Sequence, residues 1–488
     1  MVIASVVSEV PLALDPAFVA AFRKGTLTAE LASAQVGKAL PEDVDQTGIV
    51  FLLLQLCATV SAPPAGGPNK PSGAFAPYEK PNVPEGKRKK KRGARDGHKG
   101  SCRPAPTRID HFVDHEICSC PDCAGELLER EPKKLVVEDI PSGMRAEATE
   151  HTIRRGWCAK CQKQVEAKVP DALPNCRIGN RAAVLSAWLH YGLGTTTRQI
   201  VEVFNCHLQL KITDGGLTQI WHRLAGILEP WYEQIHARCL DAGVLHADET
   251  GWRLGGDLAW LWCFTRDDAT FYMIHERRSW EAAKLFFTGA FEGVLVTDFW
   301  RVYEQVECVK QKCWPHLLRE LREIDEGTEN GGDWPEFSKK LWRLYGDAVR
   351  LAARIDESDP LEYGGREARL HLRMTELALA AWENPHARRL AKRLKEFGED
   401  LLTFVAFAAV PASNNAGERA ARPAVLMRKV SQGNTTVKGA HTRSILMSIC
   451  RTLKQRGLDP LDAAVKALET YCLTGKLPPL PEKTGTGG

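Results

Sequence analysis

Two carboxylates occupy comparable places in two apolar runs of the sequence. Asp248 interrupts residues 244–254, VLHADETGWRL, and Asp298 directly follows residues 293–297, GVLVT. Apolar runs of this length read as buried strands, in which an isolated carboxylate is costly unless a cation pairs with it. The two acids therefore predict a site for divalent cations, which bind through carboxylate oxygens.

A third acid of the same kind lies far downstream. Glu418 belongs to the helical segment 413–423, SNNAGERAARP, and follows Asn414 by four residues, so the amide and the carboxylate share one helical face. Carboxylates from two strands and a helix can hold two divalent metals, which clamp a phosphate between its attacking and leaving oxygens. Neighbours in a strand alternate faces, so Glu249 points away from Asp248. The rivals for the third position are Glu249, Glu304 and Glu399.

The elements that must position these acids are several strands and one helix. Ser279 is an N-cap residue for a helix through WEAAKLFF, and the strand that follows this helix ends at Asp298. Three consecutive strands, a helix and a further strand give the order of a ribonuclease H-like core. We expect turns at residues 255–257 and 266–268, and strands at residues 244–254, 258–265, 270–275, 293–297 and 309–313.

Together these motifs resemble a DDE transposase of the insertion-sequence-66 type. The resemblance spans residues 100–470, and its specificity comes from the agreement of motif type, order and spacing. Residues 430–434, VSQGN, depart from it, because an aromatic-containing stretch is usual there. The matching residues are HADET at 246–250, Thr297, Asp298 and Tyr303, CWPH at 313–316, Arg319, Asn414, Asn415, Glu418, Arg419, Arg422 and Pro423.

The resemblance implies Mg²⁺-dependent strand cleavage at transposon ends and strand transfer into target DNA. Asp248, Asp298 and Glu418 would be the catalytic residues and would hold two Mg²⁺. The implied partners are double-stranded DNA with terminal inverted repeats, target DNA, further copies of the chain in a synaptic complex, and accessory proteins of the same element. The implied place of action is the nucleoid in the bacterial cytoplasm.

Two alternatives of other classes remain open. A domesticated relative would bind DNA without catalysis, and a ribonuclease H-like nuclease would cut DNA and never join it. All three candidate acids are present, which argues against decay of the site. An assay for cleaved and joined strands separates the three hypotheses.

Basic residues predict contacts with the DNA backbone. A run of six directly follows a segment rich in Pro, Gly and Ala, which is typical of an extended linker. Such an arm binds phosphates without reading sequence, and the competing interpretation is a solvated tail. The candidate DNA-binding residues are Lys87, Arg88, Lys89, Lys90, Lys91, Arg92, Arg319, Arg419, Arg422, Arg428 and Lys429.

Two CxxC pairs predict a zinc-ribbon-like module, in which four thiolates form a closed tetrahedral site. The ligands are Cys120, Cys123, Cys158 and Cys161, and short strands are expected at 135–137 and 152–154. A single CxxC could be a redox pair, but two of them favour structural Zn²⁺. The metal would contribute to the folding of a module without a core of its own.

Two further patterns leave their interpretation open. Predicted helices at 180–191, 195–204 and 213–228 fit either a helix-turn-helix, with Arg198 or Gln219 toward DNA, or a plain helical bundle. The pair Cys313 and His316 is either half of a metal site or a buttress of the active site.

Length and composition bound the remaining interpretation. At 488 residues the chain should form several domains, and its net charge of +4 is too small to identify a partner. The sequence shows no secretory leader, and its 15 cysteines therefore suggest a reducing compartment. The longest apolar run, residues 48–60, is too short to span a bilayer, so no membrane partner is expected.

The expected architecture is a multidomain α/β protein. A zinc-ribbon-like module and a helical DNA-binding region precede a ribonuclease H-like mixed-sheet core with a helical insertion. The expected domains are an N-terminal helical region (1–60), a linker with the basic arm (61–100), the zinc module (101–172), the helical region (173–240), the core (241–324 and 406–450), its insertion (325–405) and a C-terminal helix and tail (451–488).

Overall fold

The computed structural model describes residues 106, 108–109, 112–113, 125, 135–136, 143–327 and 330–482. The predicted N-terminal helical region, the linker, the basic run at 87–92 and the cysteines Cys120 and Cys123 lie outside the described residues. Within the described part of the chain, no helix combines the length and the apolar character that crossing a bilayer requires.

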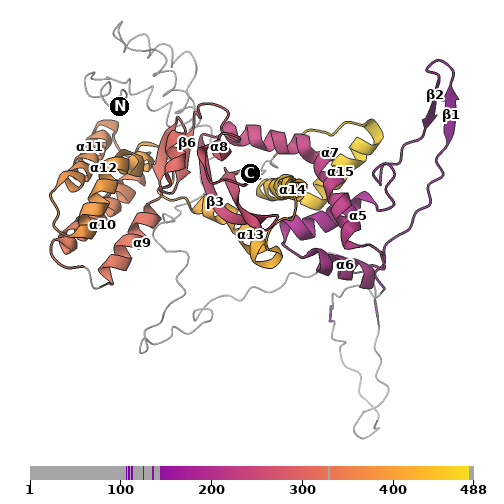
Figure 1. Ribbon diagram of the computed structural model, residues 1–488, viewed down its shortest axis with the longest axis horizontal. Coiled ribbons are helices and arrows are strands. Elements are labelled where there is room, and N and C mark those ends of the chain that lie inside the picture. Colours follow the sequence, from indigo (N-terminus) through magenta and orange to yellow (C-terminus); the bar gives the residue numbers. More distant parts are fainter. Residues whose placement is uncertain are drawn as a thin grey trace.

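A five-stranded mixed sheet lies at the centre of the described chain (Figure 1). Its order is β5-β4-β3-β6-β7. β4 is antiparallel to both of its neighbours, whereas β6 and β7 run parallel to β3. The chain is therefore a mixed α/β protein, as the sequence predicted. The strands are β3 (Val244–Leu254), β4 (Asp257–Thr265), β5 (Thr270–His275), β6 (Val294–Thr297) and β7 (Val309–Lys312).

Two glycines form the turn between β3 and β4. Leu254 pairs with Asp257, so Gly255 and Gly256 are the whole turn, with φ angles of +63° and +98°. A two-residue turn with positive φ at both positions matches the right-handed twist of the flanking strands, and glycine adopts such angles without steric cost. The turn fixes the pairing register of β3 and β4 and so the face on which each side chain lies.

The sheet separates two apolar cores. Along β6, Leu295 packs into the core formed with residues 173–291 and 420–480, whereas Val294 and Val296 pack into a core formed with residues 314–410. All four residues of β6 are buried, as expected for a central parallel strand with both faces covered. The alternation along one short strand therefore joins two helical layers to one sheet.

Helix α14 (Val437–Gln455) covers the β5 edge of the sheet. Ser448 Oγ accepts a hydrogen bond from the Tyr272 amide at 2.9 Å, and Thr452 Oγ1 accepts one from the Thr270 amide at 3.1 Å. An edge strand exposes unpaired backbone groups that would otherwise attract another strand. The two hydroxyls satisfy these amides and hold α14 against the sheet.

Helix α12 (Pro385–Ala406) covers the opposite edge at β7. Gln311 Oε1 of β7 accepts from the Phe404 amide at 2.7 Å, and Thr403 Oγ1 donates to the Lys310 carbonyl at 2.6 Å. With three more helices α12 forms a helical layer at the left of Figure 1. These helices are α9 (Trp314–Asp325), α10 (Trp334–Ala352) and α11 (Pro360–Leu379).

Other helices lie on the far side of the sheet from this layer (Figure 1). The third helix of the predicted 173–240 region extends to Leu240, twelve residues beyond its expected end, although Pro230 lies inside it. Apolar packing on both sides of Pro230 sustains the helix, since Leu228 and Trp231 are both buried. The helices are α5 (Asn180–Ala187), a π-helical turn η2 (Trp188–Gly192), α6 (Thr197–Cys206), α7 (Asp214–Leu240), α13 (Asn415–Ser431) and α15 (Pro460–Thr474).

One predicted helix is much shorter in the structure. The helix expected from Ser279 through WEAAKLFF is a single turn, α8 (Trp280–Ala283), because Phe286 and Phe287 leave it to stack in the core beside Phe264. Within the predicted helical insertion at 325–405, α11 and α12 are separate helices, since Pro385 begins a new helix at its N1 position.

Candidate active site

Asp248 and Asp298 lie at corresponding positions of neighbouring parallel strands. His246 of β3 pairs with Val296 of β6, and each acid lies two residues beyond its member of this pair. Side chains two residues apart in a strand share a face, so the two carboxylates lie on one side of the sheet. Asp298 itself follows the last residue of β6.

Glu418 approaches from the first turn of α13. The negative charge of Glu418, like those of Glu249 and Asp298, raises the pKa of the Asp248 carboxyl. The largest cause is burial, and together these effects raise this pKa to about 8. The repulsion between like charges weakens with distance, so these effects indicate that Asp298 and Glu418 lie near Asp248.

Each aspartate is held by a nearby backbone amide. The Glu249 amide donates to Asp248 Oδ1 at 3.0 Å, and the Trp300 amide donates to Asp298 Oδ1 at 2.9 Å. Both donors are backbone groups within two residues of the acid, so these bonds orient the carboxylates without the entropic cost of ordering a further side chain.

Asn414 joins α13 to β3 beside the first acid. Its Oδ1 lies 3.0 Å from His246 Nδ1, and its Nδ2 donates to the Ala247 carbonyl at 2.7 Å. The backbone amide of Asn414 also donates to Cys313 Sγ at 3.2 Å. Asn414 is buried at the N-cap position of α13, and its backbone carbonyl accepts from the Glu418 amide at 3.1 Å, so it holds the first turn that carries Glu418 against β3.

Gly417 makes room for the side chain of Asn414. A Cβ atom at Gly417 would lie 2.7 Å from Asn414 Oδ1 and 3.0 Å from Nδ2. Real Cβ contacts are longer than this, so any larger residue would displace the amide from β3. The glycine inside the first turn of α13 is therefore a requirement of the site.

A buried lysine supports the segment that carries Asp298. Lys312 is fully buried, and its Nζ donates to Thr297 Oγ1 and to the Asp298 carbonyl, both at 3.1 Å. It forms an ion pair with Glu304 and lies over the ring of Phe397. Sequence reasoning missed this residue, although a lysine at the end of a predicted buried strand was a signal for a buried charge.

The rival acids are engaged elsewhere. Glu249 Oε2 accepts from Tyr303 Oη at 2.7 Å, and its other oxygen pairs with Arg278. The guanidinium of Arg278 lies against the rings of Trp260 and Trp300. Glu304 pairs with Lys312, and Glu399 is exposed on α12.

Three side chains beside this site could hold a metal ion. Three possible ligand atoms, one each from Cys313, His316 and Glu418, lie within 4.8 Å of one another. His316 Nε2 is 3.9 Å from Glu418 Oε1. Cys313 directly precedes α9 and His316 lies in its first turn. Burial raises the pKa of the Cys313 thiol to about 12, so the thiol is neutral in the metal-free protein.

The predicted DNA-binding residues have two kinds of surroundings. Arg319 on α9 and Arg419, Arg422 and Lys429 on α13 are exposed. Arg428 is half-buried and donates to the Gly251 carbonyl and to Thr250 Oγ1, so it ties α13 to β3.

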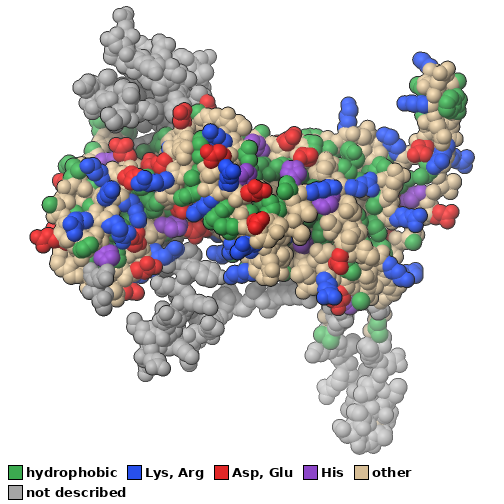
Figure 2. Space-filling view, in the orientation of Figure 1, with side chains coloured by type: hydrophobic (Ala, Val, Ile, Leu, Met, Phe, Trp, Pro, Cys, Tyr) green, Lys and Arg blue, Asp and Glu red, His purple; other side chains and the backbone are tan. Residues whose placement is uncertain are grey.

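Basic side chains on the helical layer are interspersed with acidic ones (Figure 2). Arg389 and Arg393 of α12 both pair with Glu320 of α9. Part of the positive charge on this layer therefore connects two helices of the layer to each other.

Two of the four predicted zinc ligands are described. β1 (Arg155–Cys158) and β2 (Lys163–Glu166) form an antiparallel hairpin, which projects from the body of the molecule (Figure 1). Cys158 ends β1 and Cys161 lies in the turn, where its amide donates to Cys158 Sγ at 3.4 Å. The strand predicted at 152–154 is wrong, because pairing begins only at Arg155, and Leu135 and Val136 lie in no strand.

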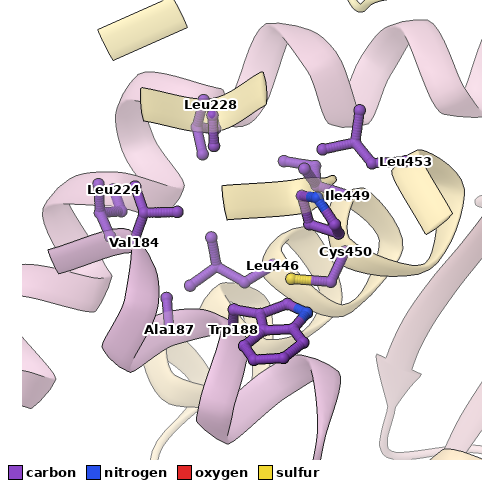
Figure 3. A pocket seen from close by; sticks show the side chains of 11 residues that line it. Val184, Ala187, Trp188, Leu224, Leu228, Leu446, Ile449, Cys450 and Leu453 are labelled. Atoms are coloured by element: carbon purple, nitrogen blue, oxygen red, sulfur yellow. The ribbon is translucent and has the colours of Figure 1, made fainter. Parts of the chain in front are cut away.

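A pocket away from the three acids has an apolar lining. It lies between α5, η2, α7 and α14, and its lining side chains are apolar apart from the thiol of Cys450 (Figure 3). Trp188, Leu224 and Leu446 line this pocket, and none of the three acids does. The acids therefore form a site distinct from this cavity.

Two proteins of Sinorhizobium fredii (strain NBRC 101917 / NGR234) are similar to this chain. "Uncharacterized protein y4qI" is 25% identical over 229 residues, which cover 42% of this chain and 42% of that protein. "Uncharacterized protein y4hP" is 22% identical over 389 residues, 70% of this chain and 68% of that protein. The chain thus spans less than half of y4qI and about two thirds of y4hP.

A family model covers the region that contains all three acids. Residues 176–442 match the model described as the transposase IS66 family, which is more than half of the 488 residues. The DDE-type transposases of this family act on DNA and use divalent metal ions. The match includes the sheet, the helical layer between β7 and α13, and the first turns of α14, and on this evidence the chain belongs to the IS66 family of transposases.

Proposed function

We propose that the protein cleaves DNA strands at transposon ends and transfers them to target DNA with Asp248, Asp298 and Glu418 as its catalytic residues. One observation carries the proposal: Asp248 and Asp298, 50 residues apart, share one face of the sheet, and the negative charge of Glu418, 120 residues further on, also raises the pKa of Asp248. Burial and the neighbouring negative charges disfavour the folded protein with an ionised Asp248 unless cations bind there. It is a reason to expect a metal site.

The sheet order supports a ribonuclease H-like core. Three consecutive antiparallel strands, β3 to β5, are followed by a helical turn and by two parallel strands on the other side of β3. The first acid then lies on the central strand, the second at the end of its parallel neighbour, and the third on a helix that packs on β3. This is the arrangement that the sequence resemblance implies.

The donor set fits Mg²⁺. Mg²⁺ prefers oxygen ligands, and three carboxylates offer six oxygens from three elements. Two bound Mg²⁺ would supply Lewis acidity to a phosphate and a clamp for its attacking and leaving oxygens. Asp248 and Asp298, each oriented by a backbone amide, would hold the pair together with Glu418.

The chain itself would position the substrates. Arg419 and Arg422 lie on α13 within one turn of Glu418, where positive charge can meet the DNA backbone. Asn414 keeps the first turn of α13 against β3, so that Glu418 stays near the two aspartates. We also assign Arg319, Arg428 and Lys429 to the DNA-facing side.

We extend the proposal to the N-terminal regions. Cys158 and Cys161, joined by a hydrogen bond from the Cys161 amide to Cys158 Sγ, would supply two ligands of the zinc-ribbon-like module, and Cys120 and Cys123 would supply the other two. Both strands of the hairpin are almost wholly exposed, with Trp157 68% exposed, so the hairpin needs another source of stability. The basic run at 87–92 would bind phosphates, and synapsis of two ends would require several copies of the chain.

The test uses the purified full chain, Mg²⁺ and labelled duplexes that carry the ends of its own element. We expect cleaved ends and joined products from the wild type. Asp248→Asn should abolish both while leaving DNA binding within about twofold, because the substitution removes one charge and keeps the shape. Asp257→Asn, at an exposed position of the same sheet, is the matched control and should behave as the wild type.

Three results would contradict the proposal. Cleavage by Asp248→Asn would remove Asp248 from the site. Cleavage by the wild type without joined products would favour a nuclease. DNA binding without either reaction would favour a domesticated DNA-binding relative.

A further inference from the structure

We propose that Cys313, His316 and Glu418 form a second metal site, selective for thiophilic divalent cations such as Zn²⁺, and that its occupation inhibits the Mg²⁺-dependent reaction. The second part of the proposal rests on the function proposed above, because Glu418 belongs to both sites. The first part does not depend on it, since metal binding can be measured without a DNA substrate.

The three residues come from two segments that are fastened together. Cys313 and His316 lie at the start of α9, and Glu418 lies at the start of α13. The Trp314 amide donates to the Ala412 carbonyl at 3.0 Å, and the Asn414 amide donates to Cys313 Sγ at 3.2 Å. The backbone therefore holds both helix starts side by side, and only side chains have to move when a cation binds.

The distances require little movement. The three ligand atoms lie within 4.8 Å of one another. In a tetrahedral Zn²⁺ site with bond lengths of about 2.0 to 2.3 Å, ligand atoms lie about 3.3 to 3.5 Å apart. His316 and Glu418 have side chains that are 34% and 29% exposed, so rotations about their side-chain bonds can close a gap of up to about 1.5 Å.

The buried sulfur and the imidazole are both arranged as metal ligands. Amide hydrogen bonds from Asn414 and from His316 reach Cys313 Sγ, and such bonds stabilise a thiolate. The same type of bond joins the Cys161 amide to Cys158 Sγ in the predicted zinc knuckle. The Nδ1 atom of His316 is buried, and no group in the described part of the chain forms a hydrogen bond with it.

A buried ring nitrogen without a partner destabilises the folded protein, and a cation bound at His316 Nδ1 would offset this cost. In the described part of the chain, the side chains grouped closely enough to hold a metal ion are those of Cys313, His316 and Glu418, a thiol, an imidazole and a carboxylate. That set suits Zn²⁺ or Co²⁺, whereas Mg²⁺ binds oxygen and does not compete for the sulfur. Three protein ligands leave a fourth position for water.

One Glu418 carboxylate cannot bind fully to a cation at Cys313 and His316 and to Mg²⁺ at the two aspartates at the same time. A Zn²⁺ ion held by Cys313 and His316 would draw the Glu418 carboxylate toward α9, away from the two aspartates. We therefore expect Zn²⁺ to slow the Mg²⁺-dependent reaction, and higher Mg²⁺ to reverse the inhibition only in part, because Mg²⁺ does not displace a metal bound to sulfur.

The binding test uses the full chain with Co²⁺, whose bond to sulfur gives a charge-transfer absorption band. The background variant Cys158→Ser/Cys161→Ser removes one half of the predicted zinc knuckle. In this background we expect a sulfur-to-cobalt band that saturates at one Co²⁺ per chain. Adding Cys313→Ser should abolish the band. The matched control is Cys308→Ser, a nearby cysteine outside the cluster, which should keep the band.

His316→Gln is a second variant, because its half-exposed position makes a folding defect less of a concern. We expect it to weaken Co²⁺ binding at least tenfold, which is about 1.4 kcal/mol. A band that is absent from the background variant, or that survives both Cys313→Ser and His316→Gln, would overturn the site.

The inhibition test measures cleavage in Mg²⁺ with and without added Zn²⁺, and each variant is compared with its own rate in the absence of Zn²⁺. Zn²⁺ should lower the wild-type rate at least tenfold, but should lower the rate of His316→Gln less than threefold. Equal inhibition of both would refute the regulatory role. If the wild type does not cleave at all, the proposed function fails, while the Co²⁺ result still decides the metal site.

Discussion

Asp248 should make the metal-free protein less stable as the pH rises. Its folded pKa is about 8, against 3.8 for an ordinary carboxyl group, because burial and then the charges of Glu249 and Asp298 disfavour its ionised form. Between these two pH values the unfolded chain has released the proton and the folded chain still holds it. Raising the pH therefore favours unfolding, and the loss of stability is complete above the folded pKa.

The size of the effect follows from this difference in pKa. Each pKa unit corresponds to 1.36 kcal/mol, so the full difference corresponds to about 6 kcal/mol. The carboxyl group is only partly shielded, and screening by water reduces the expected loss to about 3–5 kcal/mol. Asp248→Asn keeps the shape, removes the charge, and should be the more stable protein by this amount at pH above about 8.

The assay is urea unfolding followed by tryptophan fluorescence, at pH values from about 4 to about 9 and with a metal chelator present. The wild type and Asp248→Asn should have similar stability at the lowest pH and diverge as the pH rises. Asp257→Asn, which removes an exposed carboxylate of β4, is the control and should follow the wild type. Added Mg²⁺ should stabilise the wild type at high pH by about 2.7 kcal/mol at one hundred times its Kd, and the variant much less.

Parallel curves for the wild type and Asp248→Asn over the whole pH range would refute the reasoning. They would mean that Asp248 ionises as an ordinary carboxyl group, so that the three acids do not repel one another in the folded protein. A divergence that Mg²⁺ leaves unchanged would support the raised pKa of the buried carboxyl group and contradict a role for Asp248 in metal binding.

Three further predictions test the supports of the site. Gly417→Ala should displace Asn414, whose Oδ1 would lie 2.7 Å from the new Cβ, and should cost about 1–3 kcal/mol in urea unfolding with a larger loss of cleavage. Lys312→Met should cost about 3–5 kcal/mol, because it leaves the carboxylate of Glu304 without its partner, and adding Glu304→Gln should restore part of that loss. Cys158→Ser should lower the bound zinc by one equivalent per chain, measured by elemental analysis, with unchanged unfolding of the sheet.

Each of these predictions has an outcome that contradicts it. Gly364→Ala is the control for the glycine, because Gly364 lies at an exposed position of α11 and a Cβ there meets no atom within 4 Å. An equal loss in both variants would contradict the role of Asn414. For the lysine, failure of the double variant to recover any stability would show that the ion pair is not the reason. Unchanged zinc content in Cys158→Ser would remove the hairpin from the zinc site.

The sequence by itself determined the elements that carry the first two acids. The limits of β3 and β5 agree with the prediction, because apolar runs bounded by turn residues are local signals that neighbouring residues alone produce. The mixed α/β class followed from their order. The strand at 152–154 and the length of α8 were wrong, since distant contacts decided them: Phe286 stacks on Phe264 instead of continuing the helix.

Only the tertiary structure decided how the site is held together. The bond between Asn414 and His246 joins residues 168 positions apart, and the cluster at Cys313 gains Glu418 from more than 100 positions away. No local pattern encodes such pairs, because a side chain's periodicity reveals which face it occupies but not which segment meets that face. The sequence likewise does not explain why Lys312 is buried; the structure does, because Lys312 pairs with Glu304 and donates to the Asp298 carbonyl.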